Sequence, residues 1–153
     1  EDSLVRPFVS EVLLDVQLLA RDGKDYASTE TSVTVLADGV DVDAVTYGTA
    51  SAEPVIRIYG PTLSPVLYNR TMEDSGTSAR LGLDLELDAD QFVEINTKDR
   101  SVQLNGWTDE SASLRQYLTP RDWFFLNSYH NRLRLLSESG QGYAVVTWRD
   151  SHS

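Results

Sequence analysis

The sequence has no cysteine and only two histidines among its 153 residues. Disulfide bonds and thiolate metal sites are therefore excluded, and the redox compartment of the protein cannot be inferred. A structural zinc site needs four ligands, usually cysteine and histidine, which His130 and His152 cannot supply on their own. A structural zinc site is therefore not expected.

Positive charge is also scarce. The chain has 13 lysine and arginine residues against 24 aspartate and glutamate residues, which gives a formal net charge of −11. An acidic surface repels nucleic acid and anionic membranes, so neither is expected as a partner. No apolar run approaches the roughly 20 residues of a membrane-spanning helix, so we expect no membrane insertion, and no secretory signal is recognisable.

The motifs of common enzymes are missing as well. There is no nucleophile elbow and no glycine loop that could hold a phosphate. Gly140-Gln-Gly142 is expected to form a hairpin turn without a following helix, so it does not fit a dinucleotide-binding motif. His130 is predicted to lie in a turn between two strands, and His152 lies one residue from the end. We therefore expect no enzymatic activity, no catalytic residue and no cofactor.

Acidic residues, in contrast, are plentiful and alternate along two predicted strands. The alternating residues are Asp41 and Asp43 in one strand and Asp84, Glu86, Asp88 and Asp90 in the other. Alternation places each group on one outer face, where carboxylates could bind calcium or could form a solvated face that prevents edge-to-edge pairing. Because they are spread along strands and not gathered in a loop, we expect no metal site.

The clearest structural signal is a β-hairpin over residues 91–106. Its alternating apolar residues are Val93, Ile95, Val102 and Leu104. A turn centred on Lys98 and Asp99 pairs Ile95 with Val102 and Val93 with Leu104, which places all four side chains on one face. A slip of one residue would break this arrangement, so the pattern predicts the register.

A second hairpin is predicted over residues 31–44. Asp38-Gly39 is a strong two-residue turn signal. With that turn Val35 faces Val42, Val33 faces Ala44, and Ala37 faces Val40. Leu36 is the one apolar side chain on the outer face.

Six further strands are predicted from apolar runs bounded by glycine, proline or polar residues, at 54–61, 65–71, 80–88, 122–126, 131–136 and 143–148. Residues 12–20 also favour a strand, ended by Asp22-Gly23, although a helix through Val9, Leu13, Val16 and Ala20 is an alternative. A short helix is predicted over residues 110–118, with Leu114, Tyr117 and Leu118 inward.

Many short strands without strand–helix alternation predict an all-β fold, an antiparallel two-sheet β-sandwich with at most one short helix. Residues 1–10 are interpreted as a lead-in or linker and residues 11–153 as a single domain. Trp123 and Trp148 lie in apolar strands and are predicted core residues. Trp107, Tyr129 and His130 lie in predicted loops or turns, where they could contact a partner or a glycan or simply cover the rim of the sandwich.

The hairpin segment Ile-Asn-Thr-Lys-Asp-Arg-Ser-Val-Gln-Leu-Asn-Gly at 95–106 resembles the signature hairpin in the C-terminal domain of siphovirus-type distal tail and minor tail proteins. Further segments resemble other strands of that domain in the same order, and they are 16–22, 54–61, 65–69, 122–126, 131–135 and 144–150. The sequence departs from the family at Asn96, where Asp is frequent, at Tyr129-His130, where Pro-Gly is common, and at Ser151-His152, where an aromatic is usual.

The resemblance implies a galectin-like or jelly-roll type β-sandwich in the tail tip of a phage virion, assembled in the host cytoplasm. In that family an N-terminal domain forms rings, by resemblance hexameric, and the galectin-like domain docks adhesion or baseplate proteins. No counterpart of the ring-forming half is recognisable, which leaves open whether the chain belongs to a longer protein. The leading hypothesis is a structural or adaptor domain that docks neighbouring tail or receptor-binding proteins. The alternative is a carbohydrate-binding module that contacts host cell-wall polysaccharide.

Overall fold

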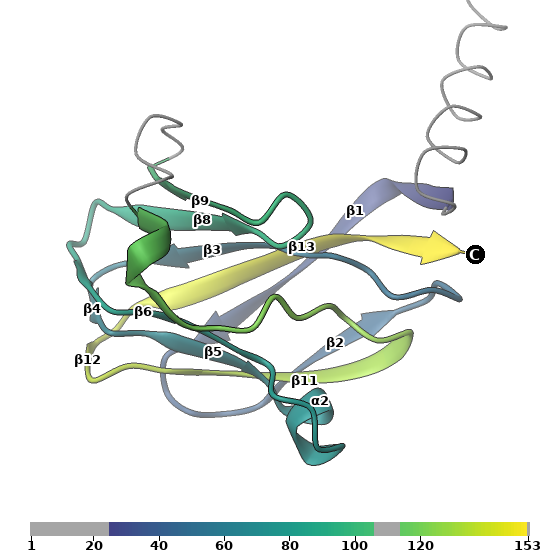
Figure 1. Cartoon of the computed structure of the whole chain (residues 1–153), viewed down its shortest axis with the longest axis horizontal. Coiled ribbons are helices and arrows are strands. Elements are labelled where there is room, and N and C mark those ends of the chain that lie inside the picture. Colours follow the sequence, from purple (N-terminus) through teal and green to yellow (C-terminus); the bar gives the residue numbers. More distant parts are fainter. Residues whose placement is uncertain (1–24, 106–113, 153) are drawn as a thin grey trace, which may run out of the picture.

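The structure, a computed structural model, describes residues 25–105 and 114–152. These residues form an antiparallel β-sandwich, which confirms the predicted fold class (Figure 1). The expected lead-in at 1–10, the expected strand at 12–20, Trp107 and residues 110–113 of the expected helix at 110–118 lie outside the described residues.

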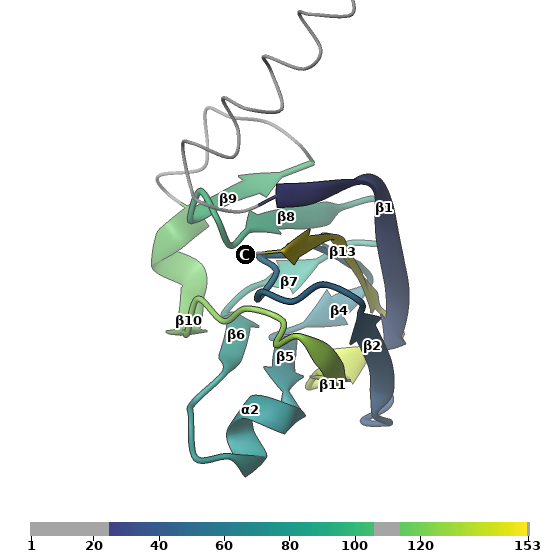
Figure 2. The same cartoon turned by 90° about the vertical axis from the view of Figure 1, so that its right-hand side faces the viewer.

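Two five-stranded sheets form the layers of the sandwich, and Figure 2 shows them from the side. Sheet A has, in spatial order, β1 (Asp25–Leu36), β13 (Tyr143–His152), β3 (Val55–Tyr59), β8 (Phe92–Asn96) and β9 (Ser101–Leu104). Sheet B has β10 (Leu118–Arg121), β6 (Arg80–Leu83), β5 (Val66–Asn69), β11 (Tyr129–Leu136) and β2 (Val42–Thr46).

A small third sheet lies at one end of the sandwich. It consists of β12 (Ser139–Gly140), β4 (Thr62–Leu63) and β7 (Glu86–Leu87). Helical structure among the described residues is short: α2 (Arg70–Asp74), which Asn69 caps by accepting from the Met72 backbone N–H, and the 3₁₀ turn η1 (Arg115–Tyr117). Tyr117, predicted to point inward, is exposed.

The core lies between sheets A and B and follows from the alternation of the strands. In β3 and β8 the inward residues Ile56, Ile58, Val93 and Ile95 are fully buried, while their sequence neighbours point outward. Leu133 and Leu135 of β11 meet them from sheet B. A period of two in the sequence therefore determines which side chains each strand buries.

The hairpin over residues 91–106 forms as predicted. Ile95 pairs with Val102 and Val93 pairs with Leu104. Asn96 supports the turn, because its side-chain Oδ1 accepts hydrogen bonds from the backbone N–H groups of Lys98 and Asp99 at 3.1 and 3.0 Å. Asparagine thus performs at this position the turn-forming role that aspartate can also perform.

The hairpin predicted over residues 31–44 is wrong. A turn does form, with Gly39 at a φ of +74°, but β1 and β2 belong to different sheets. Val35 pairs with Ala144 of β13, and Val42 pairs with Leu133 of β11. The chain therefore crosses from one layer to the other at this turn, because both strands find partners far away in the sequence.

Two other expected strands differ in the structure. The run at 80–88 is interrupted at Asp84 and Leu85 and contributes to two sheets as β6 and β7. The dense apolar run at 122–126 is not a strand apart from a single bridge between Leu126 and Ala52, and β10 precedes it instead. Its side chains still fill the core: Phe124 and Leu126 are buried, and Trp123 packs half-buried against the core.

Candidate docking surface

The outer face of sheet A carries a row of three aromatic side chains. Tyr59 of β3 pairs with Tyr143 of β13 on one side and with Phe92 of β8 on the other. The ring centroids of Tyr59 and Tyr143 are 4.8 Å apart, and those of Tyr59 and Phe92 are 5.2 Å apart. The three rings point away from the core because they alternate with the buried residues Ile58, Ala144 and Val93. We call them the aromatic row.

Leu36 extends this apolar surface onto the next strand. It is the β1 residue opposite Tyr143, and 54% of it is exposed. An exposed leucine alone is ordinary, but a leucine beside three rings on four adjacent strands forms a continuous apolar patch. The expectation that Leu36 points to the outer face is confirmed.

The orientation of the rings determines which ring faces are free to contact a partner. The planes of Tyr59 and Tyr143 are 15° apart, so the two rings stack on each other, and Phe92 lies tilted by 31° on the far side of Tyr59. The faces of the central ring are therefore occupied by its neighbours. Sugar stacking requires a free ring face, which Tyr59 therefore lacks, and the edges of the three rings together present an apolar surface that suits a protein partner.

Charged side chains lie on the outer face of sheet A next to the aromatic row. The Arg57 Nε donates to Glu94 Oε1 at 2.8 Å, and the guanidinium carbon lies 5.2 Å from the centroid of the Phe92 ring. Hydrogen bonding to the Tyr59 side chain, followed by that to Glu94, raises the pKa of Arg57 above its ordinary value. This arginine is therefore a permanent cation, held against the aromatic row.

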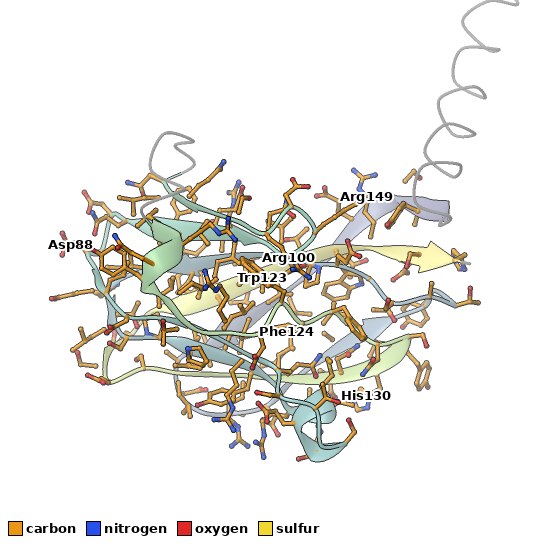
Figure 3. The ribbon with its side chains drawn as sticks, viewed as in Figure 1. Asp88, Arg100, Trp123, Phe124, His130 and Arg149 are labelled. Atoms are coloured by element: carbon orange, nitrogen blue, oxygen red, sulfur yellow. The ribbon has the colours of Figure 1, made fainter. Side chains whose placement is uncertain are left out.

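A groove extends from the row along the outer face of sheet A. It comprises a hollow of about 430 Å³ that reaches Tyr59 and one of about 480 Å³ that reaches Tyr26 and Lys98, and the two share Glu30, Val55 and Thr147. Arg149, which Figure 3 shows near β1, donates through Nη1 to the carbonyl of Ser28 at 3.0 Å and thereby supports the wall. Apolar and charged side chains both line this groove.

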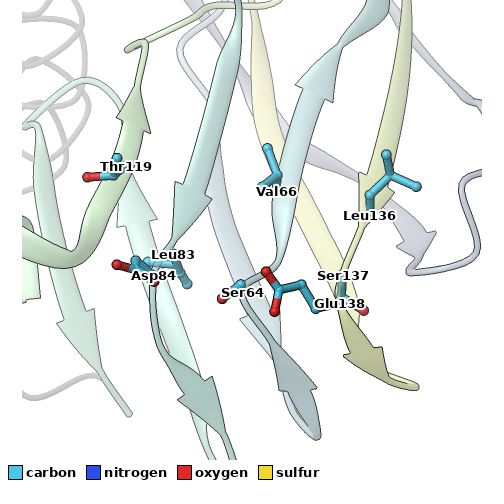
Figure 4. A pocket seen from close by; sticks show the side chains of 8 residues that line it. All are labelled: Ser64, Val66, Leu83, Asp84, Thr119, Leu136, Ser137 and Glu138. Carbon is cyan, nitrogen blue, oxygen red and sulfur yellow. The ribbon is translucent and has the colours of Figure 1, made fainter.

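A separate hollow of about 400 Å³ lies on sheet B, where β5 begins and β6 and β11 end (Figure 4). Val66 and Leu136 form its apolar part, and Asp84 and Glu138 carry its negative charges. Both carboxylates have the sign of the whole chain, and none of the described residues that line the hollow is basic. It is smaller than the groove, and its described lining residues include no aromatic side chain.

The predicted contact residues lie elsewhere. Tyr129, 70% exposed, and His130 begin β11 in sheet B, so they are neither in a loop nor beside the aromatic row. Figure 3 shows His130 above α2, and its Nε2 lies 2.9 Å from Asp43 Oδ1. Their role in binding, and that of Trp107, stays a prediction.

Sequence reasoning missed the aromatic row because its members come from three strands that are far apart in the chain. Each of the three aromatic residues does lie at the end of an alternating apolar run, on the face opposite to the buried residues. That signal indicates an outward ring in each strand. The adjacency of β13, β3 and β8, which brings the rings together, is not encoded in local spacing.

We searched the described residues for groups of metal ligands and for membrane-spanning helices. Within residues 25–105 and 114–152, no three histidine or acidic side chains are grouped so that they could hold a metal ion. Within the same ranges no helix is long and apolar enough to cross a membrane.

Comparisons with known proteins add one structural relationship. Neither the protein families nor the curated proteins searched contain a match to this chain. Among solved structures, the chain is similar to the SPP1 Dit (gp 19.1) protein, described as a paradigm of the hub adsorption apparatus in phages that infect Gram-positive bacteria. The TM-score is 0.57 at 15% sequence identity, over 86% of this chain and 49% of the other. The chain therefore spans about half the length of Dit and shares its fold.

Proposed function

We propose that this chain is a structural or adaptor domain of a phage tail tip, which docks neighbouring tail or receptor-binding proteins and catalyses no reaction. The observation that carries the proposal is the fold similarity to SPP1 Dit over 86% of the chain. The ordered sequence resemblance to siphovirus-type tail proteins, which includes the confirmed hairpin at 91–106, points in the same direction.

The outer face of sheet A is the docking surface that the geometry favours. It combines a continuous apolar patch with fixed charges, and aromatic and arginine side chains are the residue types that dominate binding energy at protein interfaces. The proposed location is the virion tail. Ring assembly, hexameric by family resemblance, would come from regions or proteins beyond this domain.

Binding to the tail proteins of the parent phage tests the proposal. We expect the purified chain to bind one of them with micromolar affinity or better. We expect Tyr59→Ser with Tyr143→Ser to weaken that binding by about tenfold or more, because hot-spot residues, among which tyrosine is enriched, contribute about 2 kcal/mol or more each. Tyr117→Ser is the matched control, since Tyr117 is an exposed tyrosine on the η1 turn, remote from the aromatic row in sequence and element.

The alternative is a carbohydrate-binding module, and the same chain on a cell-wall glycan array tests it. Capture of polysaccharide at micromolar affinity, abolished by Trp107→Ala, together with no binding to any tail protein, would establish the alternative. Electron microscopy of virions labelled with an antibody to this chain provides an independent check, because label anywhere but the tail contradicts the proposed location.

A further inference from the structure

The hollow on sheet B has an apolar floor between two walls. Leu136 of β11 lies opposite Val66 of β5, and Val66 lies opposite Gly82 of β6, so the three residues share the outer face of the sheet. Gly82 adds no side chain to this row, and a Cβ there would come within 2.6 Å of the Thr119 carbonyl oxygen. The chain at Thr119 therefore forms one wall, Leu136 forms the other, and Val66 lies between them (Figure 4).

Two acidic residues lie at one end of this floor. Asp84 directly follows β6, and Glu138 comes two residues after the end of β11. The Glu138 N–H donates to the Leu63 carbonyl at 2.9 Å, and the Ser64 N–H donates at 2.9 Å to the carbonyl of Leu85, the neighbour of Asp84. Figure 4 shows Asp84 on one side of Ser64 and the Glu138 side chain on the other. Backbone hydrogen bonds thus hold both acidic residues beside the same short segment.

Neither of these carboxylates has an ion-pair partner among the described residues, and both are exposed. The arginines that come next along β11 and β6 on this face are already paired. Arg134 Nε lies 2.8 Å from Asp41 Oδ1, and Arg80 Nε lies 2.8 Å from Glu73 Oε1. The hollow therefore combines an apolar floor with negative charge that the described part of the chain does not neutralise.

An apolar floor with a negatively charged end fits a lysine side chain. The four-carbon stem of lysine can lie on an apolar surface while its ammonium group stays among polar groups. The ammonium group carries three donors on one compact charge, and two carboxylates on different elements can share these donors. The planar fork of arginine is better suited to the two oxygens of a single carboxylate. A hydrated metal ion would gain nothing from the apolar floor.

We propose that the hollow on sheet B is a second docking site, which accepts an exposed lysine side chain of a partner protein. The net charge of −11 attracts basic surfaces to the chain, and the hollow gives one basic side chain a specific place to bind. The aromatic row lies on sheet A, so the two surfaces belong to opposite layers of the sandwich. A domain with both surfaces can bind two partners at once. This inference goes beyond the proposed function and does not depend on it.

Three blocked tripeptides, titrated into the full chain at low ionic strength, separate the contributions of the stem and the charge. The first is acetyl-Ala-Lys-Ala-amide. In the second, norleucine replaces lysine and keeps an aliphatic stem without the charge, and in the third, diaminopropionic acid keeps the charge on a short stem. The methyl resonances of Val66 and Leu136 in NMR spectra report on the hollow. We expect the lysine peptide to shift them with a millimolar Kd and to bind about fivefold more tightly than the other two peptides.

Two variants of the chain test the role of the carboxylates. We expect Asp84→Asn with Glu138→Gln to weaken binding of the lysine peptide by about fivefold, because both ion pairs are lost. Asp88→Asn with Asp90→Asn is the matched control, since it removes the same charge from two exposed aspartates that do not line the hollow. All four side chains are exposed, so both variants should keep the melting temperature of the parent chain.

Several results of these titrations overturn the proposal. Equal binding of the lysine and diaminopropionic acid peptides means that the acidic surface attracts them without a specific site, and equal binding of the lysine and norleucine peptides means that the charge contributes nothing. Equal weakening by both double variants, or by neither, places the binding outside the hollow. Shifts of the Val66 and Leu136 resonances when the chain alone is concentrated mean that a second copy occupies the hollow. Undetectable binding of the lysine peptide contradicts the proposal as well.

Discussion

Trp148 is a core residue that also contributes to the lining of the groove on sheet A. Only 3% of it is exposed, and its indole Nε1 donates to Asp150 Oδ1 at 3.2 Å. We expect Trp148→Ala to lower the free energy of unfolding by about 3–5 kcal/mol, since it removes a buried indole and leaves a cavity. Urea denaturation measures this loss.

The control for this prediction is Tyr117→Ala, which removes an exposed aromatic side chain and should change stability by less than about 0.5 kcal/mol. An unchanged unfolding midpoint for Trp148→Ala would contradict its place in the core. Trp123, for which the sequence also predicts a core position, is half-buried, so its substitution by alanine should give an intermediate loss of stability.

Asn131 is fully buried and organises a polar network inside sheet B. Its Oδ1 accepts from the Asn127 N–H at 2.8 Å, and its Nδ2 donates to the carbonyls of Asn127 and Ala44 at 3.0 and 3.2 Å. Asn69 Nδ2 donates to the same Oδ1 at 3.4 Å and to the Phe125 carbonyl at 3.1 Å. The network thereby holds the segment before β11 against β2 and β5.

We expect Asn131→Leu to destabilise the fold although leucine has a similar size. The substitution leaves buried backbone groups without partners, each at a cost of about 1–3 kcal/mol. Thermal unfolding of this variant should be compared with that of Gln103→Leu, which alters a partly exposed side chain on the outer face of β9. Equal melting temperatures for the two variants would show that the network contributes nothing.

Among the elements, α2 is attached to β6 by one carboxylate. Glu73 Oε1 accepts from Arg80 Nε at 2.8 Å and from the Ala79 N–H at 3.1 Å. The hydrogen bond to Arg80, supported by the Ala79 N–H and by the charges of Arg80 and Arg70, outweighs desolvation and lowers the pKa of Glu73. The folded state therefore favours the ionised form of this side chain.

The sign of the pH dependence follows from this lowered pKa. The stabilisation is complete above the unfolded-state pKa of about 4.3 and is lost as the pH falls through the lower folded-state pKa. We expect Glu73→Gln to lower the melting temperature at pH 7 and to converge with the parent chain in strong acid. Glu138→Gln, on an exposed glutamate beside β11, is the control. A difference between Glu73→Gln and the parent chain that did not depend on pH would contradict the role of the ionised carboxylate.

The two expected hairpins show what local sequence can predict about these elements. Residues 91–106 were predicted with the correct register because both partners lie within one short segment. Residues 31–44 carry an equally strong turn signal, and alternation placed Val33 and Val35 inward and Leu36 outward correctly. Alternation defines a face and not a partner, however, and the partners of β1 and β2 are β13 and β11. The aromatic row could not be predicted for the same reason, since three separate strands build it.

At the scale of the whole molecule, the acidic side chains of residues 25–105 and 114–152 form no common site. Asp84, Asp88 and Asp90 are exposed, and Asp41 and Asp43 make separate contacts with Arg134 and His130. We expect calcium to bind no more tightly than millimolar in calorimetry, and we expect EDTA to leave the melting temperature unchanged. A rise of several degrees on addition of calcium, with none on addition of magnesium, would show a site that the described residues do not reveal.

The position of β13 has a consequence for how the chain is made. This strand lies between β1 and β3, although it is synthesised after all the other described strands. Until residues 143–152 leave the ribosome, sheet A consists of β1 on its own and the separate unit of β3, β8 and β9. Local hairpins can form early, but the long-range pairing that joins these pieces comes last. Truncated translation products that stop before Tyr143 therefore expose both unpaired edges and become substrates for proteases.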